Sequence, residues 1–104
     1  MRTIWKYRVH QLESFTHQIP KGARFLSVQI QNGTPEIWFT VETTQEMEER
    51  KFFMALTGQE IPQDLFNVAD YLGTFQLSGG SIVCHLFEIQ DPISALVRTT
   101  LTGQ

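Results

Sequence analysis

The side chains most able to do chemistry in this 104-residue chain are one cysteine and three histidines. Cys84 and His85 are adjacent, and a thiol nucleophile needs a base such as imidazole within reach. Successive side chains of a strand point to opposite faces, so two adjacent residues on a strand cannot form that pair. We therefore expect Cys84 to be a small residue of the core.

Metal and phosphate chemistry have little more support. The three histidines share no spacing typical of zinc ligands, although folding could still bring ligands together. Gly79-Gly80 is followed neither by Gly-Lys-Ser/Thr nor by a helix, so it predicts a hairpin turn rather than a phosphate loop. We expect no catalytic residue, no metal and no cofactor. An enzyme is the least supported class, kept open by His85 and scattered carboxylates.

A binding site has better support, which comes from the alternation of side chains between the two faces of a strand. Trp38 alternates with Ile37 and Phe39, so its indole should lie on the face opposite the core. An exposed indole offers a large apolar plate with one hydrogen-bond donor, which is common in binding pockets and interfaces. The alternative is that a helix or loop covers Trp38 and makes it part of a second core.

Polar residues of a second hairpin extend this candidate site. Thr74, Gln76 and His85 fall on one face of that hairpin, where they are either ligand contacts or an ordinary solvent-facing strip. Guanidinium groups suit phosphate and carboxylate geometry, which makes nearby arginines the natural anion contacts. The expected ligand-binding residues are Trp38, Gln29, Thr74, Gln76, His85, Arg8 and Arg24.

Composition and charge exclude several classes of protein. The formal charge is −3, and the eight Lys and Arg residues form no cluster in the sequence, so we expect no nucleic-acid partner. No apolar run approaches the roughly 20 residues that span a bilayer. The first residues carry charges where a signal peptide needs an apolar stretch, and one cysteine permits no internal disulfide. We expect a protein of the cytosol with no membrane partner.

The elements that position these residues are mostly strands, because apolar residues alternate with period two. Asn32-Gly33 separates two alternating runs, 24–31 and 35–42, and this dipeptide is the strongest short-range hairpin signal. With Asn32 and Gly33 as the loop, the expected facing pairs are Val28 with Ile37, Leu26 with Phe39, Ser27 with Trp38 and Gln29 with Glu36.

A second hairpin is expected over 70–88, with Gly79-Gly80 as a two-residue turn. Between the hairpins we expect an exposed loop or short helical turn at 44–50, a strand apolar on both faces at 51–56 and a helical turn within 63–69. The expected pairs of the second hairpin are Leu77 with Ile82, Phe75 with Cys84, Gly73 with Leu86, Gln76 with Val83, Thr74 with His85 and Leu72 with Phe87.

The expected fold is a single mainly β (α+β) domain over 1–104. It has a small antiparallel sheet of six to seven strands over about 2–88. Asp91-Pro92 offers an N-cap and a proline at the first helical position, followed by apolar residues at helical spacing, which predicts a short C-terminal helix over about 91–102. Exposed strand edges and an apolar plate favour a homo-oligomer.

Several segments together resemble a known family. They include Ile4-Trp5-Lys6-Tyr7, Leu26-Ser27-Val28-Gln29, Gln31-Asn32-Gly33-Thr34-Pro35, Ile37-Trp38, Tyr71-Leu72-Gly73-Thr74-Phe75-Gln76 and Gly80-Ser81-Ile82-Val83-Cys84-His85-Leu86-Phe87-Glu88. In this order they resemble a family of small proteins from phages and prophages, a domain of unknown function, over about 3–88. The resemblance implies a phage origin and no established activity or site residue.

The resemblance also implies that such small accessory proteins act by binding. We expect a non-enzymatic homo-oligomer that sequesters a small polar or nucleotide-derived ligand, such as a host immune signal. One alternative is an inhibitor of a host defence protein that docks through the acidic segment 42–49. Another is a minor structural component of the virion.

Overall fold

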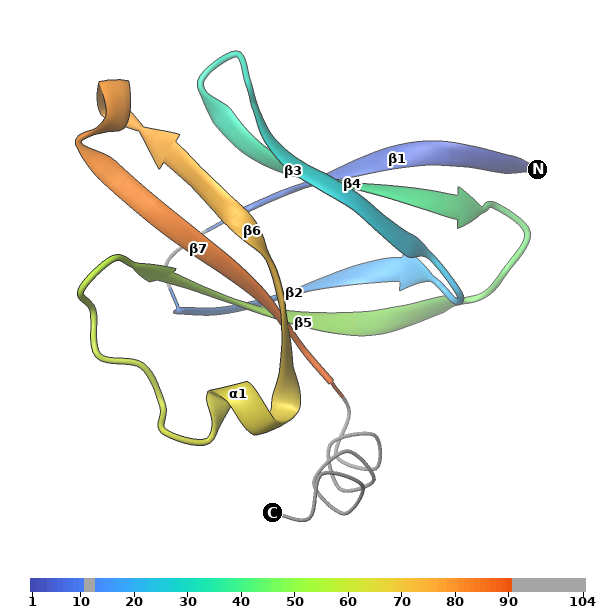
Figure 1. Ribbon diagram of the computed structural model, residues 1–104. Helices are drawn as coiled ribbons and strands as arrows, with labels where there is room; N and C mark the ends of the chain where they lie inside the picture. Colours follow the sequence, from blue (N-terminus) through green and yellow to red (C-terminus); the bar gives the residue numbers. More distant parts are fainter. Residues whose placement is uncertain (11–12, 91–104) are drawn as a thin grey trace.

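Seven strands form two antiparallel sheets in the computed structural model, which describes residues 1–10 and 13–90 (Figure 1). One sheet has the order β1-β4-β3 and the other has the order β2-β5-β7-β6. The elements are β1 (Arg2–Arg8), β2 (Glu13–Pro20), β3 (Arg24–Gln31), β4 (Thr34–Glu42), β5 (Met47–Leu56), α1 (Leu65–Val68), β6 (Ala69–Leu77), η1 (Ser78–Gly80) and β7 (Ile82–Ile89).

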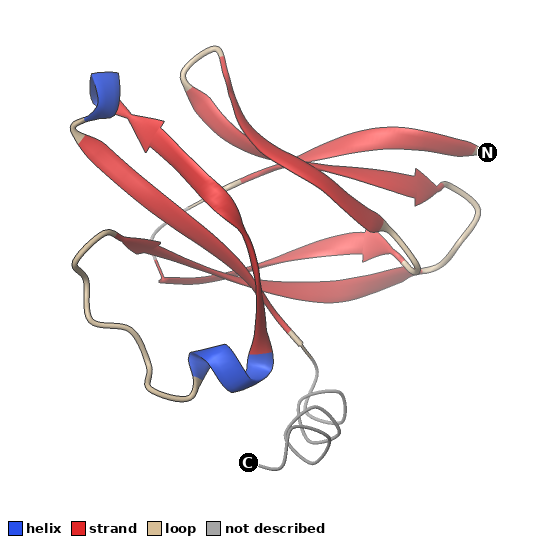
Figure 2. Ribbon diagram, in the orientation of Figure 1, coloured by secondary structure: helices blue, strands red, loops and turns tan. Residues whose placement is uncertain are grey.

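The mainly β class is confirmed, whereas the expectation of one sheet was wrong. The chain crosses between the two sheets after β1, after β2 and after β4, so strands that follow one another are often in different sheets (Figure 2). Local alternation predicts a strand but carries no information on which sheet it joins. The helix expected over 91–102 lies outside the described residues.

The two sheets pack face to face around one main core. Phe39 of β4 is fully buried, and its ring meets the rings of Tyr7, Phe25 and Phe52 edge-on or tilted at 6.0–6.3 Å between centroids. Such edge-to-face contacts add about 0.5–1.5 kcal/mol each to the burial of the rings. The other core residues come from both sheets: Ile37 and Val41 of β4, Val28 of β3, Phe15 and Ile19 of β2, Met54 of β5, Phe75 of β6, and Cys84 and Leu86 of β7.

The β3–β4 hairpin has the predicted register near its turn and a bulge farther from it. The pairs of Val28, Ser27 and Gln29 with β4 are confirmed. The pairing of Leu26 with Phe39 was wrong, because the register shifts by one residue and Phe25 lies opposite Phe39. Leu26 is the extra residue and points to solvent, which frees the larger Phe25 ring to contact Phe39.

The β6–β7 hairpin repeats this arrangement. Five of its predicted pairs are confirmed, from Leu77 with Ile82 to Gly73 with Leu86. The pairing of Leu72 with Phe87 was wrong, because a second register shift places Tyr71 opposite Phe87. The two-residue turn at Gly79-Gly80 was also wrong: a 3-10 turn over Ser78–Gly80 forms the connection, and the Ser81 N–H donates to the Ser78 carbonyl at 3.3 Å.

Gly73, beside this second bulge, allows β6 to approach β3 closely. Its φ is +157°, and a Cβ there would lie 3.1 Å from Cγ1 of Val28. We expect Gly73→Ala to lower the free energy of unfolding by about 1–3 kcal/mol, because a side chain would be strained and crowded there. Urea denaturation of Gly73→Ala in the wild-type and Val28→Ala backgrounds checks this. An equal cost in both backgrounds would show that the contact with Val28 does not matter.

β5 lies between β2 and β7, as predicted for a strand that is apolar on both faces. Its outer-face residues Phe53 and Ala55 pack under Leu65 of α1 in a small second core, and α1 itself confirms the predicted helical turn. The exposed loop predicted at 44–50 was partly wrong. Residues 47–50 already belong to β5, because they pair with residues 17–20 of β2.

Candidate functional site

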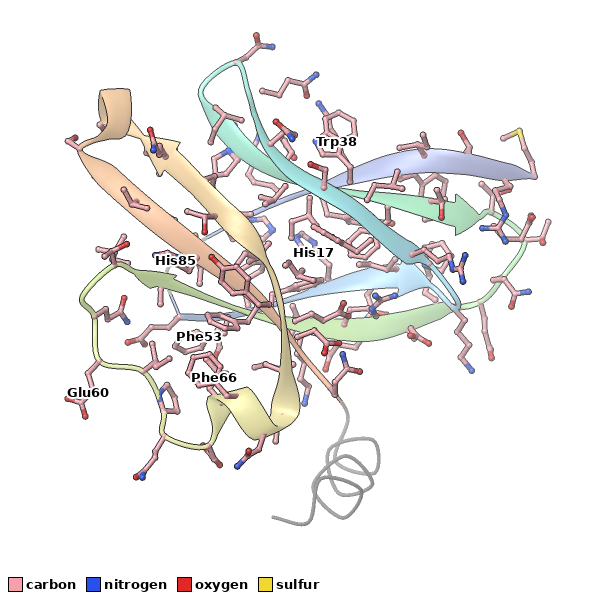
Figure 3. All side chains as sticks on the ribbon, viewed as in Figure 1. His17, Trp38, Phe53, Glu60, Phe66 and His85 are labelled. Atoms are coloured by element: carbon pink, nitrogen blue, oxygen red, sulfur yellow. The ribbon has the colours of Figure 1, made fainter. Side chains whose placement is uncertain are left out.

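The outer face of the sheet β1-β4-β3 carries Trp38, as strand parity predicted. Trp38 points away from the second sheet, whereas His17 lies on the other side of the strand β4 (Figure 3). Within the described residues no helix packs over this face, and Trp38 is half-buried there. The C-terminal helix that was the alternative cover for Trp38 falls outside the described residues. Three cross-strand rows and one further pair make up the face: Arg8-Glu36-Gln29, Lys6-Trp38-Ser27, Ile4-Thr40-Arg24 and the pair Arg2-Glu42.

The indole of Trp38 has a donor that no described residue uses. Its Nε1 is buried and has no hydrogen-bond partner among the described residues. The Nζ of Lys6 lies 5.7 Å from the centre of the ring and donates to Oε1 of Gln31, so the Lys6 side chain crosses β4 from β1 to β3. Since an unpaired buried donor costs about 1–3 kcal/mol, an acceptor that displaces Lys6 from the ring would gain a ready partner.

This face is basic although the chain is acidic. Arg2, Lys6, Arg8 and Arg24 lie on it, which is half of the eight Lys and Arg residues of a chain with formal charge −3. Of its two carboxylates, Glu42 is paired with the N-terminal ammonium group. A concentration of one charge on one surface attracts ligands of the opposite charge, so this face favours anions.

A shallow hollow of about 550 Å³ adjoins this face at the edge of β1. Its size lies within the roughly 300–1,000 Å³ of small-molecule sites. Aromatic and apolar side chains dominate its lining, which consists of Ile4, Trp5, Lys6, Tyr7, Gln18, Trp38 and Met47. A ring stacked on Trp38 would therefore find further apolar surface beside it.

The structure divides the seven predicted binding residues between two surfaces. Trp38, Gln29, Arg8 and Arg24 share the outer face of β1-β4-β3. The other three, Thr74, Gln76 and His85, lie on the outer face of the second sheet, on the opposite side of the sandwich.

The imidazole of His85 already has partners on both nitrogens. Its Nε2 lies 2.6 Å from Oγ1 of Thr57, and its Nδ1 lies 2.8 Å from the hydroxyl of Tyr71. The hydroxyl of Tyr71 is also bonded to that of Thr74. This network holds Tyr71 against β7 and leaves His85 and Thr74 less available to a ligand than the face around Trp38.

Sequence reasoning missed Lys6, the side chain that covers Trp38. The sequence did indicate that Lys6 lies on the opposite side of its strand from Trp5 and Tyr7, because it alternates with them. The pairing of β1 with β4, which places Lys6 opposite Trp38, joins residues far apart in the chain and has no local signal.

Cys84 and His85 form no thiol–imidazole pair in the part of the chain that the structure describes. Cys84 is buried, and burial raises the pKa of its thiol, which disfavours the nucleophilic thiolate. Cys84 and His85 face opposite sides of β7, as predicted. Over residues 1–10 and 13–90, no three His, Cys, Asp or Glu side chains converge to hold a metal ion. Within the same ranges, no helix has the length and apolar character needed to cross a bilayer.

His17 lies where the edge strands β1 and β2 approach each other. Its Nε2 lies 2.6 Å from the carbonyl oxygen of Arg8, and its ring is 4.8 Å from that of His10 and 5.2 Å from that of Tyr7. Burial lowers the pKa of His17 below its usual 6.5, and the neighbouring His10 lowers it further. The bond to Arg8 and the charge of Glu36 act in the opposite direction and are outweighed.

A histidine with a lowered pKa makes the fold sensitive to acid. The unfolded chain binds the proton more tightly than the folded protein, so stability falls as the pH drops below about 6.5 and is unaffected by His17 above it. Urea denaturation at about pH 7.5 and pH 5.5, with His17→Gln as the comparison, checks this expectation. A His17 ring that titrates above 6.5 in an NMR experiment would contradict it.

A second cavity, of about 800 Å³, opens between β3 and the end of the other sheet. At its floor the guanidinium of Arg50 binds the carboxylate of Glu88 with two parallel hydrogen bonds. Arg50 also donates to the carbonyl of Ala23 at 3.0 Å and lies 5.0 Å from the centre of the Phe39 ring. The guanidinium of Arg50 is thus neutralised within the protein.

Comparison with curated proteins finds no match, and comparison with solved structures finds none either. A protein family described as a domain of unknown function, DUF7352, matches residues 1–95. The match covers every strand of both sheets and the whole face around Trp38. The chain therefore belongs to the family DUF7352.

Proposed function

We propose that this protein is a non-enzymatic, homo-oligomeric accessory protein that binds and sequesters a small nucleotide-derived ligand. The ligand occupies the outer face of β1-β4-β3. One observation carries the proposal: the aromatic ring of Trp38, whose N–H has no partner among the described residues, lies among four basic side chains of an acidic chain. The resemblance to phage proteins supports a phage origin and action in the host cytosol, where a captured immune signal would be withdrawn from its receptor.

The residues of this face match the parts of a nucleotide. A base stacks on the ring of Trp38, a contact worth about 1–3 kcal/mol for aromatic side chains. A phosphate bridges toward Arg8 or Arg24, whose forked guanidinium groups bind such oxygens with two hydrogen bonds. The amide of Gln29, which now donates to Oγ of Ser27 at 2.7 Å, can turn toward polar groups of the base or sugar.

The oligomer is part of the same proposal, and its surface is the outer face of the other sheet. Phe66 of α1 and Tyr71 of β6 are 64% and 52% exposed there. Their rings pack on Phe87 but leave most of their surface in water, which a second copy of the chain would cover. This arrangement leaves both ligand faces of a dimer accessible.

The alternative of an inhibitor that docks through the acidic segment 42–49 has less support. Glu42 and Glu46 are engaged by the N-terminal ammonium group and Lys21, respectively. Residues 47–49 are part of β5 rather than of a protruding loop. A role in the virion stays a prediction, which co-purification with particles would test.

Thermal unfolding in the presence of nucleotides tests the proposal. We expect ADP-ribose derivatives or cyclic dinucleotides to raise the midpoint at low ionic strength, since a ligand at 100 times its Kd stabilises by about 2.7 kcal/mol. Adenosine is the matched control, because it keeps the ring and lacks the phosphates. No stabilisation by any nucleotide, or equal stabilisation by adenosine, would contradict an anionic ligand.

Native mass spectrometry tests the oligomer separately. We expect a multiple of the 12.0 kDa chain mass for the wild type. Phe66→Ser with Tyr71→Ser should give the single-chain mass while nucleotide binding persists. A monomeric wild-type protein would contradict the proposed oligomer and leave the ligand site unaffected.

A further inference from the structure

One hydrogen-bonding edge of the β1 backbone is not paired with any strand within residues 1–10 and 13–90. β1 pairs only with β4 among the described strands. In an antiparallel pair, residues alternate between those whose N–H and C=O point to the partner and those whose groups point away. Two bonds fix the alternation: the Thr43 N–H donates to the Met1 carbonyl at 2.9 Å, and the Val9 N–H donates to the Pro35 carbonyl at 3.0 Å.

The backbone N–H and C=O groups of the odd-numbered residues of β1 therefore point to β4. Those of Arg2, Ile4 and Lys6 point to the open side. Arg8 follows the same alternation, because its carbonyl turns away from β4 and accepts from Nε2 of His17. The open edge thus offers the backbone groups of three alternate residues, Arg2, Ile4 and Lys6, to an added strand.

The side chains along this edge determine which charge an added strand should carry. Arg2, Lys6 and Arg8 project from the same side of β1, at the outer face of the sheet. A second copy of β1 in antiparallel pairing would bring these cations opposite one another, which is destabilising. A strand with acidic side chains in the facing positions would be attracted instead.

The other side of the edge is apolar. Trp5 is 36% exposed and Met47 is 50% exposed, and both line the hollow between the edge strands β1 and β2 together with Tyr7. Side chains of an added strand alternate between the two faces of the sheet. A strand with acidic residues on one face and apolar residues on the other would satisfy both sides.

We propose that the open edge of β1 binds an extended acidic segment of a partner protein as an added antiparallel strand. The segment alternates acidic residues, which face Arg2, Lys6 and Arg8, with apolar residues, which enter the hollow at Trp5 and Met47. The sheet β1-β4-β3 then gains a fourth strand. Both ligands would use Arg8 and the hollow beside β1, but this inference does not rest on the proposed nucleotide, because the backbone of β1 rather than the ring of Trp38 would hold the segment.

Synthetic peptides of alternating Glu and Val, eight residues long and labelled with a fluorophore, test the proposal by anisotropy. In this pairing the N–H groups of the Glu residues point to β1 and those of the Val residues point away. We expect N-methylation of the Glu residues to weaken binding at least about tenfold and N-methylation of the Val residues to leave it within about twofold. A peptide of alternating Lys and Val should not bind.

A variant of the protein checks the same edge from the other side. Ile4→Pro removes one N–H that points to the open edge and no bond to β4, so the fold tolerates it and peptide binding weakens. Lys51→Glu is the control for a general effect of the protein's charge on peptide binding. Lys51 is exposed on the outer face of the other sheet, away from β1. Absence of binding by the Glu-Val peptide, or equal binding of its two N-methylated forms, would overturn the proposal. So would unchanged binding to folded Ile4→Pro.

Discussion

Replacing Glu88 with alanine is expected to lower the free energy of unfolding by about 3–5 kcal/mol. Glu88 accepts two hydrogen bonds from Arg50, one of them at 2.9 Å, and the side chains of the pair are only 11% and 15% exposed. Without this carboxylate, the guanidinium stays between the Ala23 carbonyl and the Phe39 ring with its charge unpaired. A buried charge without a counter-ion is among the most destabilising changes in a core.

Urea denaturation of Glu88→Ala against the wild type measures this loss. Glu46→Ala is the matched control, because it also removes one carboxylate from an ion pair, with Lys21, at the surface. We expect no resolvable change for that variant, since exposed pairs are screened by water and salt. Equal stabilities of Glu88→Ala and Glu46→Ala would show that the buried Arg50–Glu88 pair does not stabilise the fold.

Replacing Trp38 with leucine is expected to weaken nucleotide binding at least about tenfold, because stacking on an aromatic ring is worth about 1–3 kcal/mol. Leucine keeps an apolar group of moderate size but loses both the flat ring and the unpartnered N–H. Trp38 lies on the outer face, away from the main core, so the variant should remain folded. Titration calorimetry with the nucleotide that most raises the midpoint of thermal unfolding measures the change.

Gln76→Ala is the control for this prediction. Gln76 is exposed on the outer face of the other sheet, opposite Val83, and belongs to the predicted residues that the structure places away from Trp38. Its replacement should leave nucleotide affinity unchanged. A loss of affinity in Gln76→Ala that matches the loss in Trp38→Leu would move the ligand to the other side of the sandwich.

Local sequence signals predicted the parts of the fold that are held by local contacts. Asn32-Gly33 defined the register of β3 and β4 near their turn and therefore the outward direction of Trp38. The bulge at Leu26 escaped prediction, because an apolar residue in the right alternation looks like a core residue. Only the packing of Phe25 on Phe39 across the hairpin decides which of the two neighbours turns inward.

Long-range pairing was not visible in the sequence, and it determines the site. The alternation around Trp38 and that around His85 each gave the right face of a hairpin. They were joined into one site because nothing local shows that β3 and β6 belong to different sheets. The contribution of Lys6 has the same origin, since it depends on the pairing of β1 with β4.

The fluorescence of Trp38 alone gives the most direct test of the ligand face. The chain has two tryptophans, so Trp5→Phe leaves Trp38 as the single reporter. Titration of this variant with the stabilising nucleotide should quench its emission in a saturable way, with the same Kd that calorimetry gives and a weaker one at high salt. A nucleotide that binds by calorimetry while the emission of Trp38 stays unchanged would contradict stacking on this ring and place the ligand elsewhere.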